Sequence, residues 1–145
     1  MNFETVYNIG EAYRLQSLEG GEDYTELAAQ AMSWFERGMK LNRWDGYNFL
    51  RYGWCLDWVG RQTNSGPYFA RAEQLDPNGY FTMAYIGVHY VELNDFAAAK
   101  PWFERSLRLR WEKDVNNIAA SYLPIVTHKL LQDATNEIKL DFPAR

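Results

Sequence analysis

Hydrophobic and polar positions along the chain follow the spacing of amphipathic helices, and the pattern repeats. An eight-residue phrase occurs three times, at residues 34–41, 68–75 and 102–109. Each copy has an aromatic residue, Phe, any residue and Arg, then a small residue, two further residues and Leu. The copies begin at equal intervals, at Trp34, Tyr68 and Trp102, and self-similarity at a fixed period of this size indicates stacked helical repeats.

A second pattern, a glycine between large residues, precedes each copy of the phrase. It contains Gly10, Gly53 and Gly87, of which the last two are separated by the same interval as the copies of the phrase. Residues at this spacing share one face of a helix, where a glycine lets a neighbouring helix approach closely. Because a glycine inside a helix costs about 0.5–1 kcal/mol relative to alanine, its recurrence predicts a packing contact common to all three copies.

Together the two patterns resemble the tetratricopeptide repeat, a helix–turn–helix unit whose length equals the interval between the copies. The resemblance covers about residues 3–113 and implies an all-α fold, a right-handed α-solenoid of three such units with a C-terminal capping helix. The first unit is longer than the other two, with the surplus around residues 17–23. The expected division of one domain, 1–145, is into repeats 3–45, 46–79 and 80–113, a capping helix at about 114–134, and an irregular tail at 135–145.

Local signals agree with these helices. Asp45 and Asp95 are placed to cap the helices that begin near residues 46 and 96. Gly60 is placed to end a helix in the left-handed conformation.

Three prolines predict interruptions. Pro67 and Pro101 occupy equivalent places in successive repeats and fall inside the expected second helices, which should therefore begin late or bend there. The capping helix is predicted from an amphipathic set that includes Val115, Ile118 and Ile125, and Pro124 should kink or divide it. Its role would be to cover the hydrophobic end of the stack.

In tetratricopeptide-repeat proteins the first helices of the repeats line a concave groove. The resemblance therefore implies which residues face that groove here, and most of them are apolar or aromatic. An exposed apolar surface of this extent is usually an interaction surface, and Tyr and Trp are favoured at its hot spots. The expected groove residues are Tyr7, Glu11, Tyr47, Leu50, Arg51, Trp54, Asp57, Trp58, Phe81, Tyr85, Val88 and Tyr122.

Family members that bind chaperone C-termini clamp a terminal carboxylate with Lys, Asn and Arg at fixed groove positions. Of the corresponding residues here, only Arg51 is basic; the others are Tyr7, Glu11, Phe81 and Tyr85. We therefore expect a non-catalytic protein–protein interaction module, a scaffold or adaptor without cofactors. Its partner would be a protein or peptide that offers an apolar or aromatic segment.

Three alternatives stay open at this point. Tyr47, Trp54, Trp58 and Asp57 could form a small-ligand or glycan site, because aromatic planes beside a carboxylate suit sugar rings. The groove could instead be covered by the C-terminal tail or by a second copy of the chain, the latter giving a homodimer. The chain could also be a repeat domain or subunit of a larger bacterial assembly.

Composition narrows the classes of function. The formal net charge of −4 argues against nonspecific binding to nucleic acid or anionic lipid. No apolar run approaches the roughly 20 residues that cross a bilayer, and the N-terminus lacks a secretory signal. These features, with a single cysteine, predict a cytoplasmic protein.

Two recurring positions could carry chemistry. Cys55 and His89 occupy the same place in successive repeats and could form a nucleophilic pair, although this position usually packs against the second helix. No set of His, Cys, Asp and Glu has metal-ligand spacing, so no metal site is expected. Arg37, Arg71 and Arg105 could form an anion-binding ladder, but we expect them to be solvated or paired with Glu36, Glu73 and Glu104.

Overall fold

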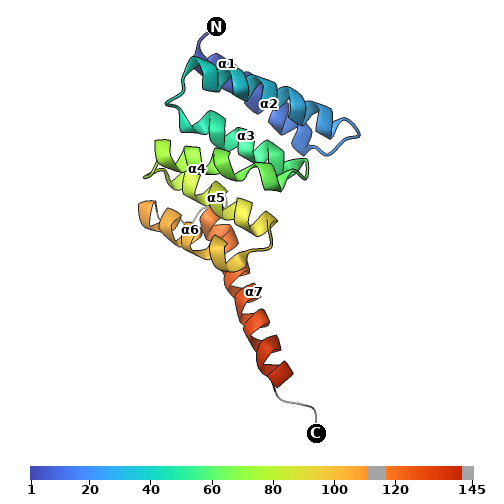
Figure 1. The fold of residues 1–145 in the computed structure, drawn as a ribbon, viewed down its shortest axis with the longest axis vertical. Coiled ribbons are helices and arrows are strands. Elements are labelled where there is room, and N and C mark those ends of the chain that lie inside the picture. Colours follow the sequence, from blue (N-terminus) through green and yellow to red (C-terminus); the bar gives the residue numbers. More distant parts are fainter. Residues whose placement is uncertain (111–116, 142–145) are drawn as a thin grey trace. The chain divides into compact units, whose positions relative to one another are not determined.

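The computed structural model describes residues 1–110 and 117–141. The described residues are helical apart from short connections and contain no strand, so the predicted all-α class is confirmed (Figure 1). The end of the third predicted repeat, the predicted cap residues 114–116 with Val115, and the tail residues 142–145 lie outside the described residues. The helices are α1 (Phe3–Leu18), α2 (Tyr24–Leu41), α3 (Gly46–Trp58), the short 3-10 helix η1 (Gln62–Asn64), α4 (Gly66–Leu75), α5 (Tyr80–Glu92), α6 (Phe96–Leu109) and α7 (Ile118–Asp141).

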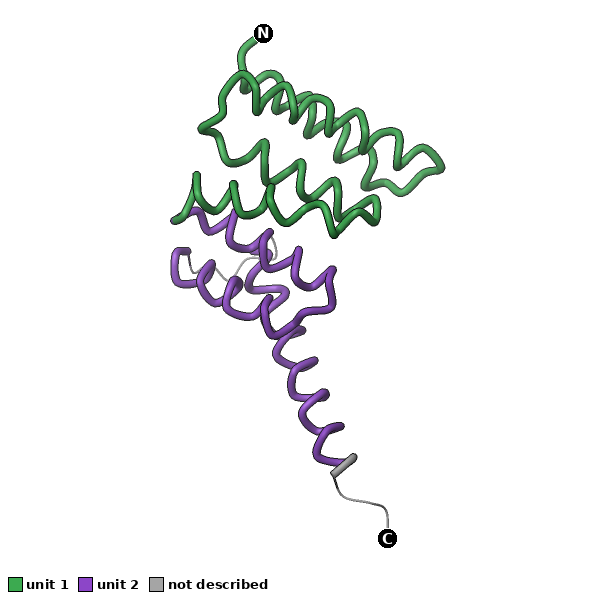
Figure 2. The backbone as a smooth tube through the Cα atoms, in the orientation of Figure 1, with its two compact units in different colours: residues 1–77 green, residues 78–145 purple. Residues whose placement is uncertain are grey.

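The chain divides into two compact units, which we describe separately (Figure 2). Unit 1 comprises Met1–Pro77 and contains two helical hairpins, α1–α2 and α3–α4, joined by packing of α2 against α3. Unit 2 comprises Asn78–Arg145 and contains the hairpin α5–α6, with α7 packed mainly on α6 and also on α5.

Each hairpin contains the same close contact between a glycine of its first helix and a phenylalanine of its second. The pairs are Gly10 with Phe35, Gly53 with Phe69, and Gly87 with Phe103. A Cβ atom on these glycines would lie 2.6, 3.0 and 2.6 Å from the ring, too close for any side chain in the first and third hairpins. The packing role predicted for the recurring glycines is therefore confirmed.

The predicted helix ends are also confirmed. Asp45 accepts a hydrogen bond from the backbone N–H of Tyr47 at 3.0 Å, and Asp95 accepts one from that of Ala98 at 3.0 Å. Gly60 follows α3 with a φ of 80°, the left-handed conformation that ends many helices.

The equivalent prolines Pro67 and Pro101 have different surroundings. Pro67 lies in the first turn of α4, which begins late, after η1, as predicted. Pro101 instead lies inside α6, which begins without delay at Phe96.

The last helix is longer than the sequence predicted. α7 is not divided at Pro124 and continues to Asp141, so residues 135–141 are helical where an irregular tail was expected. The polar segment after residue 134 has no glycine or proline before Pro143, and polar residues alone do not end a helix.

The first part of α7 covers the hairpin of unit 2. Ala119 and Val126 are completely buried in one cluster with Val88 and Phe103, and the ring of Tyr122 stacks on Phe103 at 5.5 Å. This packing is what a capping helix provides. None of the described helices is long and apolar enough to span a bilayer.

Candidate functional site

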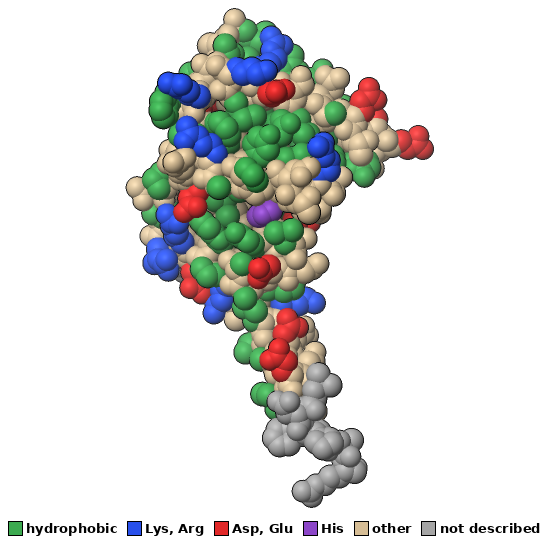
Figure 3. All heavy atoms as spheres, viewed as in Figure 1, with side chains coloured by type: hydrophobic (Ala, Val, Ile, Leu, Met, Phe, Trp, Pro, Cys, Tyr) green, Lys and Arg blue, Asp and Glu red, His purple; other side chains and the backbone are tan. Residues whose placement is uncertain are grey.

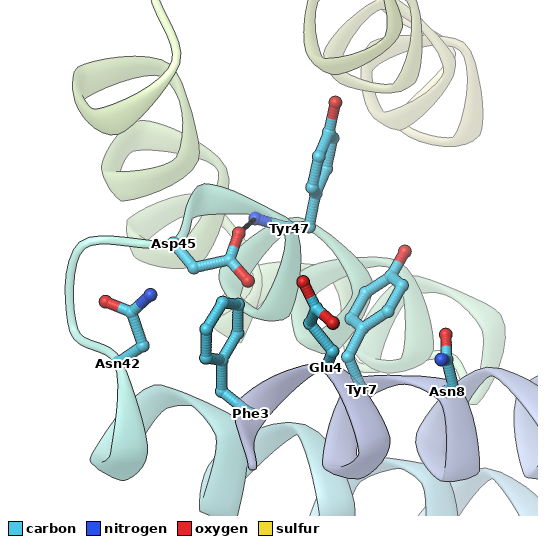
Figure 4. Close-up of a pocket in the computed structure, with 7 residues that line it drawn as sticks. All are labelled: Phe3, Glu4, Tyr7, Asn8, Asn42, Asp45 and Tyr47. Atoms are coloured by element: carbon cyan, nitrogen blue, oxygen red, sulfur yellow. Dashed lines mark hydrogen bonds between the residues drawn. The ribbon is translucent and has the colours of Figure 1, made fainter.

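An aromatic surface formed by α1 and α3 is the main candidate site in unit 1. The rings of Tyr7 and Tyr47 lie 6.3 Å apart, and Tyr7 also lies 5.8 Å from the buried ring of Phe35. Tyr47 is 42% exposed, so its ring is available to a ligand. Beside it is an open depression of about 520 Å³ (Figure 4), lined by Phe3, Glu4, Tyr7, Asn8, Asn42, Asp45 and Tyr47.

A buried ionic network fixes α1 against α3 behind this surface. Arg14 donates to both carboxylate oxygens of Glu11, with both distances 2.8 Å. The Nε atom of Arg51 lies 3.0 Å from Oε1 of the same carboxylate. The two guanidinium groups thus share one carboxylate. Because both arginines are buried, this ionic network has little access to solvent.

Aromatic rings continue from this network along α3. The guanidinium of Arg14 lies 4.9 Å from the centre of the Trp54 ring, and Trp54 stacks on Trp58 at 5.6 Å. The indole N–H of Trp58 donates to the Ser17 hydroxyl at 2.9 Å, and that hydroxyl donates to the backbone carbonyl of Tyr24 at 2.6 Å. Both tryptophans are half-buried and held from several sides, which makes them a rigid surface.

Four expected groove residues are buried instead of open. Leu50 has no exposed surface, and Arg51 is engaged with Glu11. Asp57 accepts a hydrogen bond from the buried hydroxyl of Ser65 at 2.6 Å, and Val88 belongs to the apolar core of unit 2. The side chains of these four residues are therefore packed inside the protein and do not form the open surface expected of them.

The remaining expected residues of unit 2 form their own aromatic contacts. The rings of Phe81 and Tyr85 lie 4.7 Å apart, and both residues are half-buried. Burial raises the pKa of Tyr122, whose ring lies on Phe103. The expected groove residues thus belong partly to unit 1 and partly to unit 2.

The thiol of Cys55 is unsuited to nucleophilic chemistry. Cys55 is completely buried beside Ala31 and Phe35, and this burial raises the pKa of its thiol to about 12. At neutral pH the group is therefore protonated, whereas the thiolate is the reactive form. His89, its predicted companion, belongs to unit 2, and no cluster of three metal-binding side chains occurs in the part of the chain that the structure describes.

The recurring arginines lie over aromatic rings, a contact that the sequence did not predict. Arg37 lies 4.5 Å from the centre of the Trp34 ring and Arg105 lies 5.6 Å from that of Trp102. Arg71 lies 5.9 Å from the Trp44 ring and donates to Gln74 at 2.6 Å. Of the acids expected to pair with them, Glu36 and Glu104 pair with lysines one turn away, Lys40 and Lys100.

The surface of unit 1 has an apolar area with charged side chains around it. On the face that Figure 3 presents, hydrophobic side chains gather over the helices at the centre of unit 1, with basic and acidic side chains around them. A continuous exposed apolar area bordered by charges is typical of an interaction surface.

Comparison with known proteins supports the fold. No family model and no curated protein matches the sequence. Among solved structures, the chain is similar to the first tetratricopeptide-repeat domain of Spaghetti (RPAP3), in a structure with the HSP90 peptide SRMEEVD. The two are 14% identical, with a TM-score of 0.63, and the match covers 86% of this chain and 94% of that one. The chain therefore has the tetratricopeptide-repeat fold, an all-α solenoid of helical hairpins, as its repeats predicted.

Proposed function

We propose that the chain is a non-catalytic interaction module that binds a peptide segment of a partner protein on the aromatic surface of unit 1. The observation that carries the proposal is the open depression beside Tyr47, where exposed rings of two helices meet. The similar domain of Spaghetti is bound to a peptide, which supports the same class of ligand here.

The chemistry of the ligand should differ from that of the acidic HSP90 peptide. A clamp for a carboxylate needs available basic side chains, and Arg51 was the only one at the corresponding positions. Its guanidinium is buried against Glu11. An apolar or aromatic segment therefore fits this surface better than a terminal carboxylate.

The surface is pre-organised for binding. Trp54 lies between the guanidinium of Arg14 and the ring of Trp58, while the ring of Tyr7 contacts those of Phe35 and Tyr47. A peptide that binds to rings already fixed in place loses less affinity to side-chain ordering. Large, rigid aromatic residues are also those that most often dominate binding energy.

The glycan alternative is disfavoured by the same contacts. Stacking on a sugar ring would need open polar groups beside the aromatic planes. The carboxylate of Asp57 is buried against Ser65, and the indole N–H of Trp58 is used by Ser17. The cluster thus lacks the polar groups on which that alternative was based.

Selection from a phage-displayed library of random twelve-residue peptides would test the proposal. Enriched peptides, resynthesised with a fluorophore, should bind the full chain in an anisotropy titration. Tyr47→Ala should weaken binding at least about tenfold, the effect of a hot-spot residue. Trp44→Ala is the matched control, because Trp44 is 65% exposed and lies outside the depression.

Two outcomes would contradict the proposal. One is a library in which no peptide is enriched over several rounds. The other is a Tyr47→Ala variant with native helicity that binds as tightly as the unmodified chain. Sedimentation equilibrium of both proteins tests the dimer alternative, since self-association lost in Tyr47→Ala would mean that a second copy covers this surface.

A further inference from the structure

Resting on the proposed function, we infer that the depression beside Tyr47 binds a cationic side chain, Arg or Lys, of the peptide. Two carboxylates, those of Glu4 and Asp45, line it together with three aromatic rings. Figure 4 shows Phe3, Glu4 and Tyr7 rising from α1 toward the Asp45 carboxylate and the first turn of α3. The residues that line the depression include no Lys, Arg or His.

Neither carboxylate forms an ion pair with a basic side chain among the described residues. Glu4 is exposed and has no ion pair among the described residues. Within the described parts of the chain, Asp45 accepts hydrogen bonds from neutral donors only, the backbone N–H of Tyr47 at 3.0 Å and the amide of Asn48 at 3.2 Å. A cation that enters the depression would therefore meet two carboxylates that lack a counter-charge.

The rings favour the same ligand. The face of an aromatic ring carries partial negative charge and attracts an ammonium or guanidinium group within about 6 Å of its centre. Phe3 is 37% exposed and Tyr47 is 42% exposed, so both rings can approach such a group. Arginines stacked on Trp34 and Trp44 elsewhere in unit 1 show the same contact within the protein.

The two arginines on α1 and α3 do not reverse this preference. Arg14 and Arg51 are buried and share the carboxylate of Glu11. Glu4, Asp45, Glu11, Arg14 and Arg51 together carry a net charge of −1; Glu4 is exposed and Asp45 is half-buried, whereas both arginines are buried. An acidic peptide would have to bring further carboxylates toward Glu4 and Asp45, which like-charge repulsion opposes.

The test uses the peptides enriched by the library selection and begins with their composition. We expect a recurring Arg or Lys among the apolar residues. Replacing that Arg by citrulline, which has the same shape without the charge, or that Lys by acetyl-lysine should weaken binding about threefold to tenfold. Peptides enriched in Asp or Glu, or with no recurring basic residue, would overturn the inference while leaving the proposed function in place.

A double variant, Glu4→Gln with Asp45→Asn, assigns the effect to this depression. Asn is as good an N-cap as Asp, so α3 keeps its cap. In this variant the charged and the neutral peptide should bind with almost equal affinity. Glu22→Gln is the control, because Glu22 is an exposed acid in the turn between α1 and α2. In the control, the charged peptide should keep its full threefold to tenfold advantage in affinity. If the double variant still preferred the charged peptide by the same factor, the inference would be overturned. Failure to enrich any peptide would instead overturn the function on which the inference rests.

Discussion

The same kind of packing contact occurs within unit 1 and within unit 2, but the residues next to it differ. In both units a helix glycine lies against a buried phenylalanine of the following helix. The residue after that glycine is Glu11 in α1 and Trp54 in α3, but Val88 in α5. Glu11 binds two buried arginines, and Trp54 stacks on one of them, whereas Val88 lies in an apolar cluster that α7 helps to close.

This difference indicates which positions of the repeat can vary and thus take part in binding. Glycine and phenylalanine recur at these positions in all three hairpins, and a Cβ atom on the glycine would lie only 2.6–3.0 Å from the ring. The next position along the first helix is free to carry a charge, an indole or an aliphatic chain. Recognition is therefore expected at the variable positions of unit 1 and not at the repeated phrase.

The largest expected effect comes from removing the shared acid of unit 1. Glu11→Ala would leave Arg14 and Arg51 buried without their common carboxylate, and breaking a buried ion pair from one side costs about 3–5 kcal/mol. Urea denaturation followed by circular dichroism would measure the loss. Glu36→Ala is the control, because Glu36 and Lys40 form an exposed pair whose loss should change the unfolding free energy by less than about 1 kcal/mol. Equal effects of the two changes would mean that the buried network does not stabilise unit 1.

This network marks the limit of what the sequence predicts. Glu11 and Arg14 are a turn apart and resemble an ordinary solvated pair, because charged residues at helical spacing are usually exposed. Arg51 is far from both along the chain, and only packing of α3 against α1 brings it to the same carboxylate. The close contact of Gly87 and Phe103 was predictable because it recurs at a fixed period.

Leu50 shows a second limit. Its place in the repeat matches that of Tyr7, so register alone assigns both to the groove. In the structure, however, Tyr7 is half-buried while Leu50 is completely buried. Single-sequence reasoning therefore predicted the positions of the helices better than the exposure of their side chains.

The next largest effect is expected from the glycine–phenylalanine contact that recurs within each unit. Gly10→Ala and Gly87→Ala would each push a Cβ to 2.6 Å from a buried ring, and overpacking of this kind costs about 1–3 kcal/mol. Gly53→Ala should cost less, since its Cβ would lie 3.0 Å from Phe69. Thermal unfolding of the three variants would rank them, with Gly66→Ala as the control because nothing lies within 4 Å of its Cβ. If Gly53→Ala were the most destabilised, the contact distances would not explain why glycine recurs at this place in the chain.

A pH-dependent effect is expected from Cys55 of unit 1. The thiol has a pKa of about 12 in the folded protein against an ordinary 9.0, so its stabilising contribution is fully present below pH 9 and falls as pH rises toward 12. Between pH 8 and pH 10 the unfolded chain ionises first, and stability on the order of 1 kcal/mol is lost through this group.

Cys55→Ala separates this loss from that of other groups. The variant should be less stable at neutral pH, where the thiol is protonated in both states, but its unfolding free energy should fall less between pH 8 and pH 10, by on the order of 1 kcal/mol. Tyr7 and Tyr52, whose pKa values are also raised by burial, contribute equally to both proteins and cancel in the difference. Parallel pH profiles for the two proteins would show that the thiol is not desolvated as the structure indicates.

The smallest expected effect is on stability and comes from the two aspartates that cap helices, one in each unit. Asp45→Ala and Asp95→Ala each remove a side-chain cap, which typically costs about 1 kcal/mol. Asp45→Ala should cost slightly more, because Asp45 also accepts from the amide of Asn48, whose side chain is completely buried, whereas Asp95 is exposed. Denaturant titration of the two Ala variants beside Asp45→Asn and Asp95→Asn, which keep an acceptor at the cap, would measure the difference. If Asp95→Ala proved the costlier change, the hydrogen bond to Asn48 would contribute nothing to the stability of unit 1.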